Sequence, residues 1–337
     1  NRTMYGDSIY FDRNKNFASA TNNIRLIDTL NNSFIKGHYA EVFKEKDSVF
    51  ITKRAVAITV RENDSIYVHA DTLRITGKVD NRILRGYYKA RFFKKGLPGE
   101  EPTSGKCDSI YVNEKTGITK LLQNPIMWTG ENQMTGDTIH LLRNIETSKL
   151  DTLKVFKNAF IIQKDSAGYN QVKGERLIGL FTNNDLDTIN IEKNTQVIFF
   201  SRNEEQELLG INNTTSSSIQ MHLENQQIRG IRFNKKVNGK LYPPSQFPEN
   251  ARILPGFNWY GDERLFIVND IFRGKPAPIL PKIKGIPLPK VEDDFFDENS
   301  EDELQIPEAS KLSPEHFKNK RVNKEKGTLK ERKQSKQ

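Results

Sequence analysis

Hydrophobic and polar residues alternate along much of this chain, most clearly in a five-residue phrase that occurs eight times in the first 191 residues. The phrase is an aspartate, then Ser or Thr, then an aliphatic residue, any residue, and a second apolar residue. Because side chains two residues apart lie on the same face of a β-strand, each phrase predicts a strand with two apolar residues on one face. The phrases begin at Asp7, Asp47, Asp64, Asp71, Asp108, Asp137, Asp151 and Asp187.

Small polar clusters separate these strands at irregular intervals. Residues 14–16, 31–32 and 114–117 are examples, and they are rich in Asn, Lys and Gly, which suit tight turns. The irregular intervals argue against a solenoid or a propeller, in which the repeat has a fixed length. No sustained helical periodicity occurs between residues 18 and 233. The sequence therefore predicts an all-β body.

A second phrase begins with glycine and continues with alternating aromatic and charged residues, as in 37–43 and 86–93. Gly136, Gly174 and Gly230 open similar runs. Glycine at the entry of a strand is typical of a bulge or a sharp bend, and ordinary turn glycines are the alternative. The repeated aspartates are expected to cap turns by bonding nearby backbone amides, rather than to bind calcium or to act as acids and bases.

Composition divides the chain into a body and a tail. Residues 1–275 are expected to form one β body, in which the Pro- and Gly-rich residues 94–106 form a long loop or a joint. Residues 241–275 carry prolines and a cluster of aromatic residues, and they are expected to form an irregular end cap on the sheet. Residues 276–337 are Pro-rich, then acidic, then basic, and blocks of like charge predict a disordered tail.

The net charge of +9 favours an anionic partner, and it admits phosphorylated glycolipid, nucleic acid and anionic membrane alike. Aromatic and basic residues alternate at 85–95, a pattern compatible with single-stranded nucleic acid. Ordinary β propensity explains that single stripe better, so no nucleic-acid partner is predicted.

The sequence offers no candidate for catalysis, and no cofactor or metal is predicted. The five histidines are scattered, and none has a neighbour at metal-binding spacing. Cys107 is the single cysteine, which excludes an intramolecular disulfide, and it is expected to be a small buried or turn residue. There is no apolar run long enough to span a membrane and no signal peptide. Asn1 lies only a few residues before the first strand, so an upstream targeting segment outside this chain is expected.

With these patterns in view, the chain resembles the OstA-like family of lipopolysaccharide-transport proteins, of the periplasmic LptA type. The resemblance rests on residues 6–12, 23–28 and especially 69–75, which alternate an "Ala-Asp plus aliphatic" strand with a "Gly/Asn-x-Val" type of strand. It covers roughly residues 5 to 235, and with its Pro-rich and charged tail the chain looks like one of the longer variants of that family.

The resemblance implies a twisted β-jelly roll that is open at both ends and resides in the periplasm. Its apolar interior would hold the acyl chains of lipid A, and the protein would form part of a bridge that moves lipopolysaccharide toward the outer membrane. A closed core is the alternative for any single apolar residue. The residues expected to line the groove are Ile9, Phe11, Val49, Ile51, Ile66, Val68, Leu73, Ile75, Ile110, Val112, Ile139, Leu141, Leu153, Val155, Ile189 and Ile191.

Two further sets of residues follow from the same hypothesis. Arg85, Lys89 and Arg91 are expected at the rim, where they would hold phosphates. Ile9 and Ile231 are expected on edge strands, which would pair end to end with similar jelly-roll modules or with a second copy. The competing hypothesis is a structural or adhesive β-protein that self-associates and carries no lipid.

Overall fold

The computed structural model of the chain describes residues 2–28, 33–60, 65–78, 81–96, 102–147, 149–182, 185–203, 205–224 and 227–280. The predicted tail lies outside the described residues from residue 281 onward, and so do residues 97–101 of the predicted loop. The described residues contain twenty β-strands, five short 3₁₀ helices and no α-helix. The all-β prediction is therefore confirmed.

The strands follow one another along the chain without interruption by longer helices. Their bounds are β1 (Arg2–Tyr5), β2 (Ser8–Asp12), β3 (Phe17–Asp28), β4 (Ser33–Phe43), β5 (Ser48–Thr52), β6 (Val56–Thr59), β7 (Ile66–His69), β8 (Thr72–Thr76), β9 (Ile83–Lys94), β10 (Thr103–Asn113), β11 (Ile118–Leu122), β12 (Ile126–Thr129), β13 (Asn132–Thr135), β14 (Thr138–Arg143), β15 (Leu150–Asp165), β16 (Gly168–Thr182), β17 (Asp185–Arg202), β18 (Leu208–Glu224), β19 (Gln227–Asn234) and β20 (Asn238–Tyr242). The 3₁₀ helices are η1 (Lys44–Lys46), η2 (Pro244–Gln246), η3 (Glu249–Ala251), η4 (Gly261–Glu263) and η5 (Val268–Phe272).

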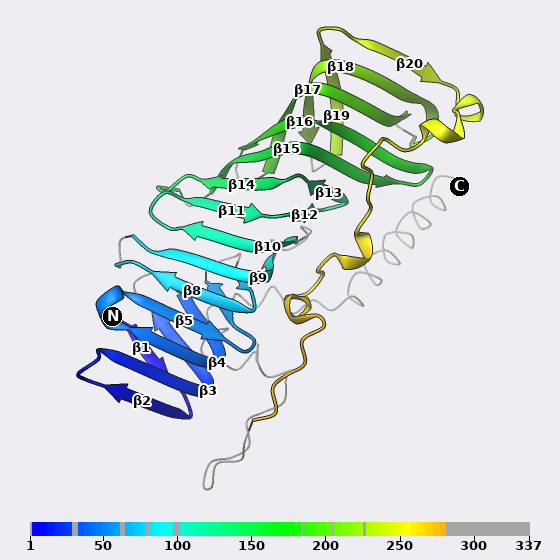
Figure 1. The fold of residues 1–337 in the computed structure, drawn as a ribbon. Coiled ribbons are helices and arrows are strands. Elements are labelled where there is room, and N and C mark those ends of the chain that lie inside the picture. The colour runs from blue at the N-terminus through cyan, green and yellow to red at the C-terminus, as the bar shows by residue number, and fades with distance from the viewer. Residues whose placement is uncertain are drawn as a thin grey trace, which may run out of the picture.

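All strand pairs are antiparallel, and the sheet is folded lengthwise into two walls (Figure 1). Wall A contains β1, β6, β7, β12, β13 and β20, and wall B contains β2, β5, β8, β11, β14 and β19. The long strands β3, β4, β9, β10, β15, β16, β17 and β18 run through both walls. This is the twisted, open β-jelly roll that the sequence predicted.

A line of corners joins the two walls. At each corner two consecutive residues adopt positive φ, which turns the chain sharply from one wall to the other. Five of the fourteen corner residues are asparagines, which tolerate this conformation better than most side chains. The corner pairs are Asn22–Asn23, Lys53–Arg54, Tyr88–Lys89, Gln123–Asn124, Lys157–Asn158, Lys193–Asn194 and Lys235–Lys236.

Four aspartates of the repeated phrase, Asp7, Asp71, Asp108 and Asp137, lie at these corners, and the bonding of Asp7 and Asp137 differs from the prediction. The backbone N–H of Asp7 donates to the carbonyl of Asn22 at 3.1 Å, and that of Asp137 donates to Lys157 at 3.2 Å. Their carboxylates accept from side-chain amides on the neighbouring strand rather than from local backbone amides. Asn23 Nδ2 lies 3.0 Å from Asp7 Oδ2, and Asn158 Nδ2 lies 2.9 Å from Asp137 Oδ1.

Glycine beside a corner allows the walls to approach closely. A Cβ at Gly136 would lie 2.3 Å from Cγ1 of Val155, a side chain with no exposed surface. Neither group has room to move, so glycine is required by this close approach rather than by its backbone conformation.

Seven of the eight aspartate-led phrases supply strands or half-strands of wall B. They fall in β2, β5, β8, β14 and in the wall B halves of β10, β15 and β17. The phrase at Asp64 leads into β7 of wall A instead. The repeated sequence pattern is therefore mainly the signature of one wall.

After β20 the chain turns back and runs along the outer face of wall A toward the N-terminal end (Figure 1). We call residues 243–280 the strap. Its apolar side chains join two clusters on that face, one around Phe160 and Phe200 that includes Leu254, and one around Val56 and Phe93 that includes Phe272. The aromatic segment that was expected to cap an end of the sheet thus lies along a wall.

Candidate functional site: an apolar trough between two walls

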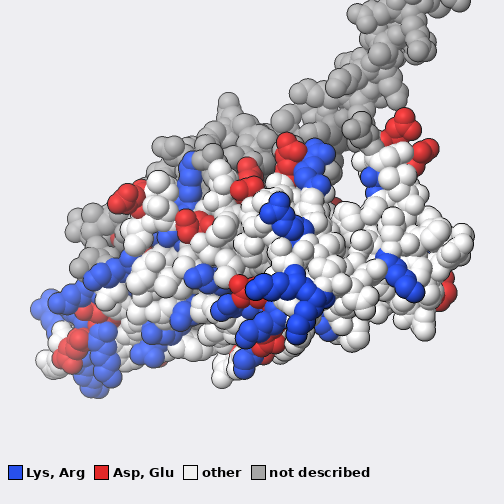
Figure 2. Space-filling view, turned by 90° about the horizontal axis from the view of Figure 1, so that it is seen from above, with Lys and Arg blue, Asp and Glu red and all other residues white. Residues whose placement is uncertain are grey.

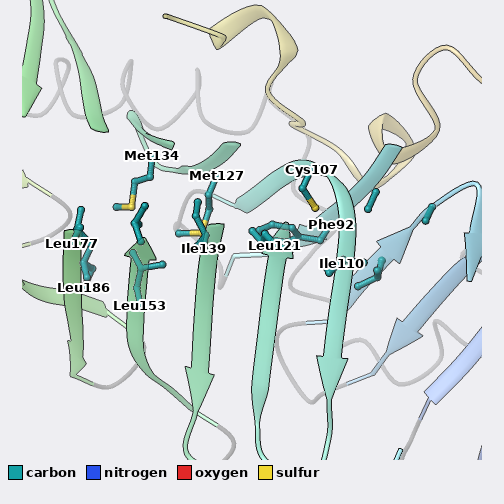
Figure 3. Close-up of a cluster of buried hydrophobic side chains, with 14 of the residues drawn as sticks. Phe92, Cys107, Ile110, Leu121, Met127, Met134, Ile139, Leu153, Leu177 and Leu186 are labelled. Atoms are coloured by element: carbon teal, nitrogen blue, oxygen red, sulfur yellow. The ribbon is translucent and has the colours of Figure 1, made fainter. Parts of the chain in front are cut away.

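One continuous hydrophobic cluster fills the space between the walls along the length of the molecule. Wall A contributes Phe92, Met127 and Met134, and wall B contributes Leu121 and Ile139. Figure 3 shows these side chains pointing toward one another from the two sides. We call this space the trough; the corners close one long side of it, and the opposite side is its mouth.

Most of the predicted lining residues lie in the trough. Eleven are buried, namely Val49, Ile51, Val68, Leu73, Ile75, Ile110, Ile139, Leu153, Val155, Ile189 and Ile191. Three more, Ile66, Val112 and Leu141, are partly buried and pack against the same cluster. Ile9 and Phe11 differ, since they are 51% and 54% exposed on β2, the last strand of wall B.

The lining becomes more exposed from the corners toward the mouth. On β10, Ile110 is buried and Val112, two residues nearer the mouth, is only partly buried. On β14, Ile139 has no exposed surface and Leu141 is partly buried. Apolar side chains are thus reachable from the mouth, while deeper side chains pack on one another.

Two shallow hollows on the described surface lie at the corners and outside the trough. One is lined by Tyr87, Gln123 and Asp137, and the other by Lys193 and Ser217 among others. The apolar lining residues lie in neither hollow. The deepest lining side chains are buried against one another, so a bulky apolar ligand would reach them only if the walls moved apart.

A buried ion pair joins the two walls near the mouth. Asp28 points inward from the end of β3 in wall A, and Arg82 points inward just before β9 in wall B. Arg82 Nη1 contacts Asp28 Oδ2, and the two side chains are 5% and 7% exposed, respectively. Because the two residues come from opposite walls, this ion pair holds the mouth closed in its part of the trough.

The three basic residues predicted at the rim lie on three different surfaces. Arg85 lies on the outer face of wall B, where its Nη1 donates to Thr76 Oγ1 at 3.0 Å. Lys89 lies at a corner, on the side opposite the mouth. Arg91 lies under the strap and donates to the carbonyl oxygens of Ile271 and Arg273 at 3.0 and 2.6 Å.

Buried glutamines hold the strap by its backbone. Gln171 Nε2 donates to the carbonyl of Arg252 at 2.7 Å, and its Oε1 accepts from the N–H of Leu254 at 2.8 Å. Gln133 repeats this pattern with Asn258 and Tyr260, both at 2.7 Å. Neither glutamine side chain has exposed surface. These polar residues were not recognised from the sequence, because a glutamine in a strand is usually a solvent-facing residue.

His69 lies beneath the strap and is expected to make stability depend on pH. Its Nδ1 lies 2.7 Å from the carbonyl oxygen of Ala55, and its ring packs on Phe272 with centroids 4.9 Å apart. Burial lowers the pKa of His69 from 6.5 to about 4, and burial likewise lowers the pKa of His38 to about 4.

Lowering the pH from 7.5 to 5.0 is therefore expected to reduce the free energy of unfolding by about 2 kcal/mol for each of these two histidines. The unfolded chain takes up protons near pH 6.5 and the folded chain only near pH 4, so this stability is present above about pH 7 and is lost as the pH falls. Urea denaturation at both pH values measures the loss. H69Q should show a smaller pH dependence, and an unchanged dependence would refute the assignment.

The remaining candidate groups for chemistry lead to no site. Cys107 is buried, and burial raises the pKa of its thiol to about 12. The described ranges contain no group of three or more His, Cys, Asp and Glu side chains that could hold a metal ion. No helix in the described part of the chain is long and apolar enough to cross a membrane.

Both ends of the sheet have edge strands. Within the described residues, β1 and β2 each pair only with β3, and β19 and β20 each pair only with β18. Tyr5, Ile9, Tyr10 and Phe11 at the N-terminal end are all more than half exposed. Ile231 on β19 is partly buried against the trough cluster.

Fold and site together define a class of protein: an open, two-walled β-jelly roll with an apolar trough. No protein-family model matches this chain, and no curated protein matches it. Among solved structures it is similar to LptH, described as the LptA-homologous periplasmic component of the conserved lipopolysaccharide transport device from Pseudomonas aeruginosa. The two share 15% identity over 42% of this chain and 96% of that chain, with a TM-score of 0.33.

Proposed function

We propose that this chain binds lipopolysaccharide in the periplasm and acts as one module of a bridge that moves it toward the outer membrane. The observation that carries the proposal is the continuous apolar cluster between the walls, whose lining is increasingly exposed toward the mouth. Acyl chains of lipid A would enter there and lie along the trough, while the sugar and phosphate groups stay in water.

The energetics of this proposal require the walls to separate. Burial of an acyl chain yields about 0.8 kcal/mol per methylene group, and the chain would replace contacts that the lining residues now make with one another. The net binding free energy is thus the free energy gained by burying the acyl chain minus that lost when the lining residues separate. Because the two are similar in size, each binding event stays reversible. Transport along the trough then needs no catalytic step, and the proposal includes none.

The edge strands support the second part of the proposal, which is end-to-end association. Exposed backbone and apolar side chains at β2, including Ile9, suit pairing with an edge strand of another jelly-roll module or of a second copy. At the other end β19, with Ile231, offers the complementary edge. Continuous pairing would join the troughs of successive modules.

Lipid extraction tests the proposal against its main competitor, a self-associating structural β-protein without lipid cargo. The competitor is favoured by one observation, the close packing of the deepest lining residues. Protein purified from a lipopolysaccharide-producing cell is extracted with organic solvent and the extract is analysed by mass spectrometry. We expect about one lipid A molecule per protein chain. A lipid-free extract from a folded, self-associated protein would favour the structural β-protein without lipid cargo.

A further inference from the structure

The outer face of wall B carries basic side chains in a row that crosses neighbouring strands. The strand register places Phe50, Arg74, Arg85, Tyr111, Lys120, His140 and Lys154 opposite one another in sequence, from β5 to β15. We call this set the basic row. Figure 2 shows Lys and Arg side chains gathered in groups on the described surface.

The basic row lacks nearby acids. No Asp or Glu occupies an outward-facing position of wall B on the described strands from β5 to β15. The nearest acid in register with the row is Glu41, opposite Phe50, at one end; at the other end the register continues from Lys154 to Ile178 and Asn190, which carry no charge. Arg74, Arg85, Lys120 and Lys154 form no ion pair with any described carboxylate.

Three of the four cations are held against aromatic rings, and none extends fully into solvent. All four are half-buried. Arg74 lies 4.9 Å from the centre of the Phe50 ring, and Arg85 and Lys120 lie 5.3 and 5.6 Å from that of Tyr111. Cations whose side chains are already ordered lose less entropy on binding an anion.

The same contacts argue against nucleic acid as the partner. Base stacking requires an open aromatic face. In the basic row the rings are occupied by cations, and Phe156 beside it is packed by His140 at 4.8 Å. The row therefore suits an anion that is recognised by charge alone.

The chain itself contains such an anion. Residues 292–303 hold eight acidic residues and no basic residue. Near its end, the strap is fixed beside wall B by Lys275. The carbonyl of Lys275 accepts a hydrogen bond from Arg54 Nη1 at 2.9 Å, and its ammonium pairs with Asp71, the residue before β8. The strap therefore carries the chain toward wall B. Arg74, the first cation of the basic row, lies on that strand.

The connecting chain and the acidic segment are both long enough for the segment to lie along the basic row. Eleven residues, 281–291, connect residue 280 to residue 292, enough to span up to about 40 Å. The basic row from Arg74 to Lys154 crosses five strand spacings, or about 24 Å, which a twelve-residue acidic segment can cover. A tethered segment also acts at an effective concentration in the millimolar range, which favours it over a free anion.

We propose that the acidic segment 292–303 binds across the basic row on the outer face of wall B of the same chain. It thereby neutralises this face and competes with any other polyanion for it. The proposal is independent of lipid binding in the trough, which lies on the opposite side of wall B.

His140 provides a reporter within the basic row. Burial lowers its pKa, and the neighbouring Lys120 and Lys154 lower it further. The groups that face it are these two lysines and the Phe156 ring. An anion bound on the row would offset the lysine charges and raise the pKa of His140.

Carbodiimide crosslinking of the full chain tests the proposal directly, since the reagent joins a lysine ammonium to a carboxylate in contact with it. At low salt we expect Lys120 and Lys154 to crosslink to residues 292–303 several-fold more than Lys164, which is more exposed and lies on wall A. The preference should vanish in about 1 M salt, where charges are screened within about 3 Å.

Three outcomes would overturn the proposal. They are equal crosslinking of Lys164, crosslinks from the acidic segment to residues 318–337 only, and crosslinks that join two chains in a mixture of ¹⁴N- and ¹⁵N-labelled protein.

A variant of the full chain with the eight acids changed to Asn or Gln gives a second measurement by NMR titration. We expect the pKa of His140 to be lower in that variant than in the original chain. In an R74Q/R85Q/K120Q/K154Q background, changing the eight acids should leave the pKa of His140 unchanged. Binding would be contradicted if changing the eight acids left this pKa unshifted in the original background as well.

Discussion

Replacing Arg82 with alanine is expected to lower the free energy of unfolding by about 3–5 kcal/mol, the usual effect of removing one partner of a buried ion pair. Arg82 and Asp28 are 5% and 7% exposed, so the substitution would leave a carboxylate in a site from which water is largely excluded. Because the pair joins wall A to wall B, its loss also removes a polar contact across the mouth. Equilibrium denaturation in urea measures the effect.

Two controls separate the lost ion pair from lost packing. In D28L/R82L both charges are absent, and we expect stability within about 2 kcal/mol of the original protein, because no charge remains buried alone. R85A removes an arginine from the outer face of wall B, where the side chain is half exposed, and should cost about 1 kcal/mol or less. Similar losses in R82A and R85A would contradict the role of the Asp28–Arg82 pair.

Changing Gln133 and Gln171, the two buried glutamines that hold the strap, to leucine is expected to release the strap from wall A. Each of Gln133 and Gln171 makes two hydrogen bonds to strap backbone and has no exposed surface, so each Q→L change leaves a strap N–H and a strap carbonyl without their partners. We expect a loss of about 2–4 kcal/mol for each change. Trypsin cleavage after Arg252 and Arg264 should accelerate strongly in Q133L/Q171L.

Gln220 offers a matched control for this experiment. It lies in the wall B half of β18, faces outward and donates to Asn190 Oδ1 at 3.2 Å, away from the strap. Q220L should cost about 1 kcal/mol or less and leave the strap protected. A strap that stays protected in Q133L/Q171L would show that the apolar clusters alone hold it.

The two walls differ in how well the sequence predicts them. Wall B strands alternate between apolar residues that face the trough and polar residues that face water, so the phrase with period two located Ile110 and Ile139 correctly as inward-facing. Wall A strands have apolar residues on both faces. Phe92 faces the trough and Phe93 faces the strap, and Ile161 and Ile162 repeat this arrangement.

A strand that is apolar on both faces gives no alternation, which is why the wall A side of the trough was missed apart from Ile66 and Val68 on β7. The grouping of Arg85, Lys89 and Arg91 failed because the corner at Tyr88 and Lys89 carries β9 from wall B to wall A, so that Arg85 and Arg91 face outward on opposite walls. The Asp28–Arg82 ion pair joins residues far apart in sequence, and so do the hydrogen bonds from Gln133 and Gln171 to the strap. No local pattern predicts such contacts.

The structure also suggests how the trough would open. Wall A is braced along its outer face by the strap, whereas wall B is joined to it by the corners, by the apolar cluster and, near the mouth, by Asp28 and Arg82. We therefore expect wall B to be the wall that moves when acyl chains enter. The corners, with their paired residues of positive φ, are the natural hinge line.

Site-specific photo-crosslinking in lipopolysaccharide-producing cells tests the central claim most directly. The photo-reactive residue is placed at Ile110, which faces the trough, or at its neighbour Tyr111, which faces outward on the same strand. We expect capture of lipopolysaccharide at position 110 and not at position 111, with the same contrast at Ile139 and His140. Equal capture at neighbouring positions, or capture only at the outward ones, would contradict a trough that holds acyl chains.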